Sequence, residues 1–351
     1  MAARVTVLRG DGIGPEVVEA ALTVLGACVP VEVREARVGG DAIDHDGDPL
    51  PADTLAACRD ADAVLLGAVG GPRWEGPLRA EDGLLRLRRG LALFANLRPA
   101  RHLGLPTPLR DGVARGADLL VVRDLAGGVY FGEPRGQGGE EAFNTWRQTA
   151  DQARRVARVA FEAARLRRRR VTSVDKANVL EASRLWRAAV TGVGRDYPDV
   201  ELEHRYVDAA SFELLQAPRR FDVILAENLF GDILSDELAA VVGSIGLLAS
   251  ASLGEGTPLF EPVHGSAPSL AGLGIANPTG AILSIALMLR HALGRPDLAA
   301  AVEAAVESAL RDVRTPDIGG NASTRDFTLA VLRRLSRSPE EDGVSAYGWG
   351  V

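Results

Sequence analysis

Short apolar runs alternate with longer segments of helical spacing along most of the chain. Polar or turn-forming residues bound each run, and the longer segments repeat apolar residues every three or four positions. Strands that alternate with helices in this way predict an α/β protein. The runs predicted as strands are residues 4–8, 63–66, 119–123, 171–175 and 223–226.

The predicted helices lie between these strands and after them. Pro15 favours a helix start, because the first helical position needs no N–H donor. Five arginines within residues 165–170 close one segment, and we interpret them as a solvated helix end, since cations favour a helix C-terminus. Residues 336–351 are polar and predict a frayed tail. Helical spacing covers residues 15–27, 82–93, 151–166, 180–193, 230–242, 278–292, 297–313 and 324–335.

Composition narrows the class of protein. The chain has 351 residues, 46% of them hydrophobic, which suffices for one large core or two smaller ones. A net charge of -7 argues against a nucleic-acid-binding protein, which needs basic surface. The 2 cysteines suit a reducing compartment. No apolar stretch approaches the roughly 20 residues of a membrane span or forms a signal peptide. We expect a cytoplasmic protein without nucleic-acid or membrane partners.

Lys176 is the only lysine, and the other 39 of the 40 basic residues are arginine. Arginine has therefore replaced lysine almost everywhere that a solvated positive charge suffices. Lysine can lose its proton when it is desolvated or lies beside other cations, whereas arginine effectively cannot. The retention of lysine at one position therefore indicates that its side chain needs to lose a proton there. The alternative is chance survival of one surface lysine.

A glycine-rich turn at residues 10–16 follows the first strand and opens the first helix. Its position suggests a dinucleotide loop. However, Gly14 comes one residue too early for the third glycine of the Rossmann pattern, and Pro15 follows it. The sequence therefore argues against a Rossmann fold, and a tight strand-to-helix turn is an equal interpretation.

Asp232 and Asp236 lie four residues apart and share one face of a predicted helix. Like charges at this spacing destabilise a helix by about 0.2–0.5 kcal/mol. The helix N-terminus would offset this for Asp232 and less so for Asp236. A divalent cation between the two is the other explanation, and oxygen ligands suit Mg²⁺ or Mn²⁺. Asp208, predicted at a strand end, is a candidate third ligand.

Arg88, Arg98 and Arg123 stand in three separate segments. Arginines at strand ends can bind carboxylates through two parallel hydrogen bonds, although a chain this rich in arginine has many such positions. The segment from His264 to Asn277 contains small residues, which let a ligand approach the backbone closely. Spacing alone leaves open whether either group forms a site.

Together these segments resemble the β-decarboxylating dehydrogenases, the family of the 3-isopropylmalate, isocitrate, homoisocitrate and malate or tartrate enzymes. The resemblance runs from about residue 5 to residue 335. FANLRP at 94–99 and GVYFGEPRG at 128–136 are similar to the 3-isopropylmalate branch in particular. The most specific segments are residues 10–16, 94–99, 128–136, 174–179, 228–236 and 264–277.

The resemblance implies a two-domain α/β fold with a long mixed sheet flanked by helices, distinct from the Rossmann fold. The cofactor-binding first domain would comprise residues 1–94 and 243–351. The second domain, residues 95–242, would carry the dimer interface and a β-arm near residues 127–147. The implied assembly is a homodimer. Its active sites would lie between the domains and also use the partner subunit's Lys176 and the partner subunit's Asp208.

The implied reaction is the NAD- and metal-dependent oxidative decarboxylation of 3-isopropylmalate to 2-oxoisocaproate, in leucine biosynthesis. Lys176 would be the general base, and Tyr130 would help to protonate the enolate. The ligands implied for Mg²⁺ or Mn²⁺ are Asp208, Asp232 and Asp236. The residues implied to contact the substrate are Arg88, Arg98, Arg123, Asp208, Glu81 and Leu84.

The implied cofactor contacts gather mainly in two glycine-containing loops. Relatives that select NAD often carry aspartate after the proline of the His-Gly-Ser-Ala-Pro motif, where this chain has Ser269 followed by Leu270. Neither residue offers a cation for the 2′-phosphate of NADP, so NAD stays the expected cofactor. The implied contacts are Gly71, Glu81, Asn178, His264, Gly265, Ser266, Ala267, Ser269 and Asn277.

Two alternatives remain open at this point. The same chemistry could act on isocitrate, homoisocitrate, malate or tartrate, or a diacid of specialised metabolism. Leu84 and Leu85 favour an isopropyl group, because an isocitrate enzyme would need polar residues there. A non-catalytic or nucleic-acid-binding relative is the second alternative, and the intact Lys176 and Tyr130 argue against it.

Overall fold

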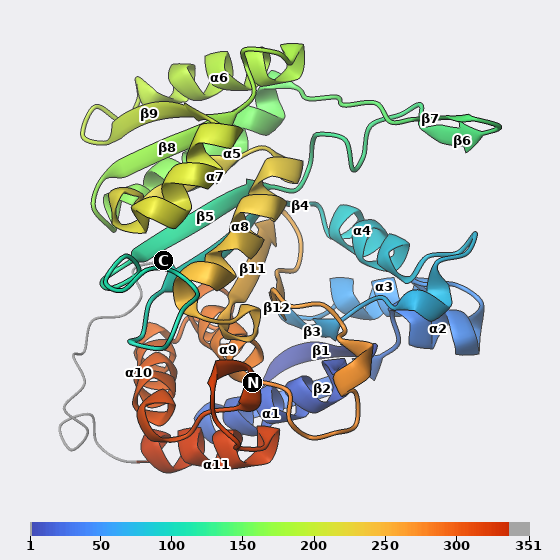
Figure 1. The fold of residues 1–351 in the computed structure, drawn as a ribbon. Coiled ribbons are helices and arrows are strands. Elements are labelled where there is room, and N and C mark those ends of the chain that lie inside the picture. Colours follow the sequence, from blue (N-terminus) through green and yellow to red (C-terminus); the bar gives the residue numbers. More distant parts are fainter. Residues whose placement is uncertain (1, 337–351) are drawn as a thin grey trace. The chain divides into compact units, whose positions relative to one another are not determined.

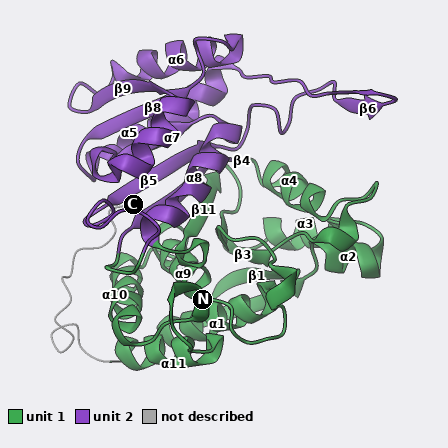
Figure 2. Cartoon of the chain, in the orientation of Figure 1, with its two compact units in different colours: residues 1–93, 103–106, 243–349 green, residues 94–102, 107–242, 350–351 purple. Residues whose placement is uncertain are grey.

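The structure, a computed structural model, describes residues 2–336 and confirms the predicted α/β class (Figure 1). The tail predicted at residues 336–351 lies outside this range apart from Ser336. Contacts divide the chain into two compact units (Figure 2). Unit 1 comprises residues 2–93, 103–106 and 243–336 of the described chain, and unit 2 comprises residues 94–102 and 107–242. The mixed sheet has ten strands, five from each unit.

In unit 1, β1 lies between two parallel neighbours, β2 and β3. β12 pairs parallel with β3, and β11 pairs antiparallel with β12. Every residue of β3 is buried, as expected for a strand covered on both faces. The strands of unit 1 are β1 (Ala3–Gly10), β2 (Val31–Ala36), β3 (Ala63–Ala68), β11 (Ala249–Gly254) and β12 (Leu259–Pro262).

The helices of unit 1 cover this part of the sheet. α9 is apolar nearly all round and is buried from Thr279 to Leu289, which is typical of a helix inside a core. It packs on α1, α10, β11 and β12. No helix within residues 2–336 is long and apolar enough to cross a membrane. The helices of unit 1 are α1 (Gly14–Cys28), α2 (Gly39–Asp46), α3 (Ala52–Arg59), α4 (Ala80–Gly90), α9 (Thr279–His291), α10 (Pro296–Asp312) and α11 (Thr324–Leu335).

In unit 2, the strands run in the order β4-β5-β10-β8-β9. β4 pairs antiparallel with β5, and the other neighbours are parallel. The strands are β4 (Leu93–Arg101), β5 (Asp118–Asp124), β8 (Arg170–Asp175), β9 (Glu201–Tyr206) and β10 (Val223–Ala226). The helices are α5 (Ala150–Arg165), α6 (Glu181–Gly194), α7 (Val207–Gln216) and α8 (Asn228–Val242). A two-stranded hairpin, β6 (Gly136–Gly138) and β7 (Glu141–Phe143), lies in the stretch implied to form a β-arm.

The predicted strands and most predicted helices are confirmed to within about two residues. One prediction is wrong at its end: the helix expected over residues 82–93 stops at Gly90, and Leu93 begins β4. α8 begins at Asn228, two residues earlier than expected, so Asp232 lies one full turn inside the helix. The helix N-terminus therefore offsets the charge of Asp232 less than expected.

The interpretation of the arginine run as a solvated helix end is wrong for Arg167. Its side chain is 5% exposed and pairs with Asp118 at 2.6 Å and with Asp222 at 3.0 Å. Asp222 is 1% exposed and also accepts a hydrogen bond from the backbone N–H of Arg168 at 2.9 Å. Asp118 begins β5 and Asp222 precedes β10, so these ion pairs join the amino ends of neighbouring strands.

We expect Arg167→Ala to lower the free energy of unfolding by about 3 kcal/mol, because it removes the buried, hydrogen-bonded cation from Asp222 and leaves only the half-exposed Arg168 guanidinium at 3.6 Å. Arg165→Ala is the matched control from the same run, since its partner Asp199 is exposed to water and the loss should be smaller. Denaturant unfolding of the two variants measures this difference. Equal losses would show that Arg167 does not neutralise a buried charge.

Candidate active site

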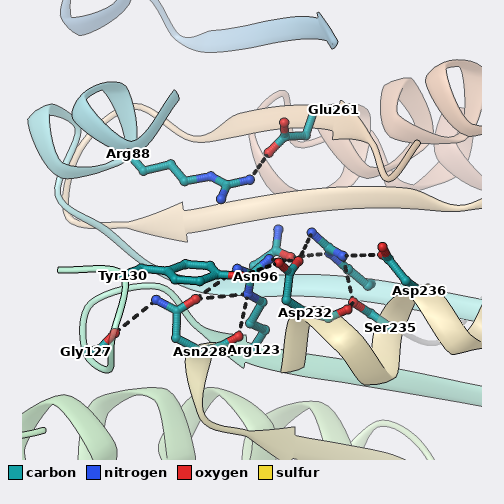
Figure 3. Close-up of polar contacts among 11 residues, drawn as sticks. Arg88, Asn96, Arg123, Gly127, Tyr130, Asn228, Asp232, Ser235, Asp236 and Glu261 are labelled. Carbon is teal, nitrogen blue, oxygen red and sulfur yellow. Dashed lines mark hydrogen bonds and ion pairs between the residues drawn. The ribbon is translucent and has the colours of Figure 1, made fainter. Parts of the chain in front are cut away.

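Two arginines and two aspartates gather in unit 2 (Figure 3). Arg98 comes from β4, Arg123 from β5, and Asp232 and Asp236 from α8. Asn96 pairs opposite Arg123 in the β4–β5 register, and Arg98 lies two residues beyond Asn96. Residues two apart on a strand share a face, so the pairing of β4 with β5 brings the two guanidinium groups to one side of the sheet.

Asn228, the first residue of α8, fixes the orientation of the buried Arg123. The Nε atom of Arg123 donates to the Asn228 backbone oxygen at 3.0 Å, and Nη2 donates to Asn228 Oδ1 at 2.9 Å. The Nη1 atom of Arg123 donates to Asp232 Oδ1. A Cβ atom at Gly231 would come within 2.8 Å of Arg123 Cγ, so α8 can approach the arginine this closely only with glycine there.

Arg98 is held in a similar way. Its Nε donates to Asn96 Oδ1 at 2.7 Å, and its Nη1 donates to Ser235 Oγ at 2.6 Å. The same guanidinium lies 3.5 Å from Asp232 Oδ1 and 3.4 Å from Asp236 Oδ1. Two oriented, buried cations therefore face two carboxylates, as buried charges require.

Asp232 is the centre of this cluster. Besides the arginines, the hydroxyl of Tyr130 donates to Asp232 Oδ2 at 2.7 Å (Figure 3). Burial raises the pKa of Asp236, the Arg98 cation opposes that rise, and the charge of Asp232 adds to it. A divalent cation would relieve the repulsion between the two carboxylates, and the oxygen donors suit Mg²⁺ or Mn²⁺. Within residues 2–336 of one chain, no group of three or more potential ligands could hold a metal ion.

Lys176 and Asp208 form a second pair in unit 2, with 2.6 Å between Lys176 Nζ and Asp208 Oδ1. Lys176 follows β8 directly. Asp208 lies in the first turn of α7, two residues after the strand end at which it was expected. The hydrogen bond from Lys176 holds the pKa of Asp208 below its usual range. The lysine side chain is 26% exposed and the aspartate 67%, so both can reach a ligand. Asn178 is exposed two residues beyond Lys176.

Unit 1 carries the remaining expected substrate residues on α4. The Nη2 atom of Arg88 lies 2.7 Å from Glu261 Oε1 of β12, and both side chains are buried (Figure 3). The Nε of Arg88 is buried without a hydrogen-bond partner among the described residues. Glu81, Leu84 and Arg88 follow helical spacing and share one face of α4. Glu81 is exposed, whereas Leu84 and Leu85 are half-buried.

The loop from His264 to Asn277 also belongs to unit 1. Burial lowers the pKa of His264, whose Nδ1 lies 2.9 Å from the Gly265 oxygen and whose Nε2 has no hydrogen-bond partner within the described residues. Asn277 donates to Asp317 Oδ2 at 3.0 Å and accepts from the Thr279 backbone N–H at 3.0 Å. Ser266 is buried, Ala267 has a φ of 38°, and Ser269 and Leu270 are exposed. The loop therefore has fixed ends and an exposed middle.

A family model described as isocitrate/isopropylmalate dehydrogenase matches residues 4–331. The chain belongs to that family. It is 52% identical to the 3-isopropylmalate dehydrogenase of Deinococcus radiodurans, covering 96% of this chain and 99% of the relative. It is 49% identical to the enzyme of the same name from Aquifex aeolicus, covering 95% and 97%.

Solved structures agree with this assignment. The fold matches an isocitrate dehydrogenase from Methylococcus capsulatus with a TM-score of 0.89 and 37% identity, over 96% of this chain and 100% of that one. It also matches a β-decarboxylating dehydrogenase from Thermococcus kodakarensis with a TM-score of 0.80 and 38% identity, over 95% and 96%.

Sequence reasoning missed the residues that orient the arginines, namely Asn96, Asn228, Ser235 and Glu261. Only Asn96 carried a usable signal, because its two-residue spacing from Arg98 puts both on one strand face. The others lie more than one hundred residues from their arginine along the chain. Their contacts depend on tertiary structure.

Glu227, directly before α8, is buried among carboxylates that the arginine cluster does not neutralise. Ser183 donates to Glu227 Oε2 at 2.7 Å, and Oε1 has no hydrogen-bond partner within residues 2–336. Burial is the main cause that raises the pKa of Glu227 to about 8; the Ser183 hydrogen bond opposes this shift, and the charges of Asp175 and Asp124 contribute to it. The side chain is therefore largely protonated at neutral pH.

A carboxyl group whose pKa is raised by folding binds its proton more tightly in the folded state, so its contribution to stability falls as pH rises from about 4.5 to about 8. Glu227→Gln cannot titrate. Between pH 5 and pH 8, we expect the free energy of unfolding of the wild type to fall by about 1–3 kcal/mol more than that of Glu227→Gln. Denaturant unfolding at both pH values measures this. The exposed Glu181→Gln serves as control, and equal pH dependence in all three proteins would contradict a protonated Glu227.

Proposed function

We propose that the protein catalyses the NAD- and divalent-metal-dependent oxidative decarboxylation of 3-isopropylmalate to 2-oxoisocaproate, a step of leucine biosynthesis. The observation that carries the proposal is the cluster of oriented Arg98 and Arg123 around Asp232, with the Tyr130 hydroxyl on the same carboxylate. Relatives named 3-isopropylmalate dehydrogenase share about half of the sequence over nearly its full length. The names of these relatives support both the proposed reaction and the proposed class of substrate.

The arginines would bind the two carboxylates of the substrate. Arg98 and Arg123 are held by asparagine side chains, so little side-chain entropy is lost when they bind an anion. Arg88 would join them, since its buried Nε has no other partner within the described residues. Leu84 and Leu85 would pack against the isopropyl group, and Glu81 would lie beside them. An apolar pocket wall favours this diacid over one with a third carboxylate.

The divalent metal would be held by Asp232, Asp236 and the partner subunit's Asp208. Three carboxylates match the oxygen preference of Mg²⁺ and Mn²⁺. The bound metal would supply Lewis-acid polarisation of the C2 oxygen, and NAD would supply the acceptor for the C2 hydride. Arg98 and Arg123 pair with Asp232 and fix the orientation of its carboxylate.

Proton transfer would fall to Lys176 and Tyr130. The partner subunit's Lys176, in its neutral form, would accept the proton of the C2 hydroxyl. Loss of CO₂ leaves an enolate, and the Tyr130 hydroxyl would donate a proton toward its carbon. The hydrogen bond from Tyr130 to Asp232 places that hydroxyl beside the proposed metal ligands.

NAD would bind to unit 1 with a contribution from Asn178 of unit 2. The Nε2 of the buried His264, which has no hydrogen-bond partner in the described part of the chain, and the exposed residues Gly265 and Ser269 suit a polar ligand. The other contacts would be Gly71, Glu81, Ser266, Ala267 and Asn277. Ser269 and Leu270 bring no cation for a 2′-phosphate, so NAD is preferred over NADP.

The homodimer and the domain roles belong to the same proposal. Residues 1–94 and 243–351 would form the cofactor-binding domain, and residues 95–242 the domain with the dimer interface and the β6–β7 arm. Each active site would combine residues of both subunits. The cytoplasm is the expected location, and it agrees with the unbonded Cys28 and Cys58.

A substrate panel tests the proposed function. We expect the highest kcat/KM for 3-isopropylmalate with NAD⁺ and Mg²⁺ or Mn²⁺, and no turnover after exhaustive chelation. Isocitrate, homoisocitrate, malate and tartrate are the comparison substrates, because the isocitrate dehydrogenase of Methylococcus capsulatus shares the fold. A higher kcat/KM for one of these diacids would make that diacid the substrate instead. A higher kcat/KM with NADP⁺ would make NADP the cofactor instead.

We expect Lys176→Arg to lower kcat by about 10²–10⁴-fold without unfolding the protein, because a guanidinium keeps its proton at neutral pH and cannot act as a base. The substitution preserves the charge next to Asp208. Arg154→Lys, an exchange at an exposed position of α5, is the reverse control and should leave kcat unchanged. More than about a tenth of wild-type kcat in Lys176→Arg would mean that the lysine is only a cation.

Mixed dimers test the shared active site. Inactive Lys176→Arg and inactive Arg98→Ala chains, once combined, should regain some activity. In each mixed dimer one site would carry both lesions and the other neither. Mixed dimers that form and stay inactive would refute the use of the partner subunit's Lys176.

A further inference from the structure

The turn at residues 10–16 takes no part in the chemistry proposed above, yet it contacts three separate segments of unit 1. β1 ends at Gly10 and α1 begins at Gly14, so the turn joins a buried strand to a buried helix. Its side chains and backbone bind α2, the segment at Gly70, and both ends of the loop from His264 to Asn277. Two of these segments are the proposed NAD loops.

Asp11 binds the first of them. Its buried carboxylate accepts three backbone N–H groups: Gly40 at 2.9 Å and Gly70 at 2.8 Å on Oδ2, and Asp41 at 2.9 Å on Oδ1. Gly70 precedes Gly71, and a Cβ atom at Gly70 would lie 2.4 Å from Glu81 Oε1. One carboxylate therefore fixes the backbone beside Gly71 and Glu81, both proposed to contact NAD.

The turn binds the second loop at two points. The backbone N–H of Ile13 donates to the Ser266 oxygen at 2.8 Å. Gly12 has a φ of 59°, and a Cβ atom there would stand 1.9 Å from that same oxygen, so only glycine permits the contact. At the far end of the loop, Glu16 Oε1 accepts the backbone N–H of Ala276 at 3.2 Å. The exposed residues around Ser269 lie between these two anchors.

We propose that Asp11 and Glu16 are positioning residues for the nicotinamide cofactor, which hold the Gly70–Gly71 segment and the loop from His264 to Asn277 in one fixed geometry. The inference rests on the proposed function, because it uses the NAD loops named there. Loops that are ordered before a ligand arrives lose less conformational entropy on binding. The turn thus acts through the backbone of the two loops and needs no contact with the cofactor.

Glu16 gives the sharper test, because it is half-buried on the first turn of α1 and its removal leaves the core intact. NADH binding to the full-length protein without substrate is followed by fluorescence titration. We expect Glu16→Ala to raise the Kd for NADH by about five- to tenfold, the effect of one lost anchoring hydrogen bond. Glu16→Gln retains an acceptor for the Ala276 N–H and should bind NADH like the wild type.

Glu19→Ala is the matched control. Glu19 lies one turn further along α1, is exposed, and pairs with Arg9. Its loss should leave the Kd for NADH and the KM for the diacid unchanged. In Glu16→Ala the KM for the diacid should change less than twofold. General destabilisation of unit 1 would not raise the Kd for NADH while leaving this KM nearly unchanged. A Kd for NADH within twofold of the wild type in Glu16→Ala, or an equal loss in Glu16→Gln, overturns the proposal.

Asp11→Asn extends the test to the first loop. The substitution keeps the size of the side chain but replaces one acceptor oxygen with a donor that faces backbone N–H groups. We expect weaker NADH binding with a smaller change in diacid KM. Wild-type protein that binds neither NADH nor NADPH would refute the proposed function and this inference with it. Wild-type and variant proteins that bind NADH equally would refute the inference alone.

Discussion

The arrangement of unit 2 depends on one constraint: the guanidinium groups of Arg98 and Arg123 are buried and need anions beside them. Asp232 meets that need for both, and Asp236 lies near Arg98. The antiparallel pairing of β4 with β5 brings the cations to one face, and the glycine at position 231 lets α8 bring the carboxylates to them. Charge compensation therefore sets the position of a helix as well as the geometry of a site.

In unit 1, a buried charge also needs partners, and backbone N–H groups provide them. Here one buried carboxylate, that of Asp11, accepts N–H groups from segments that are far apart in the sequence. Buried acceptors of this kind need several donors, and the donors become fixed in return. Both units therefore contain a buried arginine–carboxylate pair, and unit 1 in addition uses a buried carboxylate to hold backbone N–H groups.

The sequence predicted the five strands whose residues form continuous apolar runs, as in β3 and β10. It did not reveal β2, whose residues VEVREA are mostly exposed at the edge of the sheet and carry alternating charges. Pro99 obscured β4, since proline weakens a strand signal. The pair Asp232 and Asp236 was visible as two like charges on one helix face. Arg98 and Arg123 were also candidates, but their contacts with these aspartates could not be predicted, because the β4–β5 register is a tertiary property.

The ion pair between Lys176 and Asp208 has a chemical consequence outside catalysis. Because the chain has no second lysine, amine-selective acylation can modify one ε-amino group and, besides it, only the chain terminus. That amine is part-exposed and bound by a carboxylate at 2.6 Å, so it reacts only while the pair is open. The rate of acylation therefore reports how often Lys176 leaves Asp208, without any label having to be engineered into the protein.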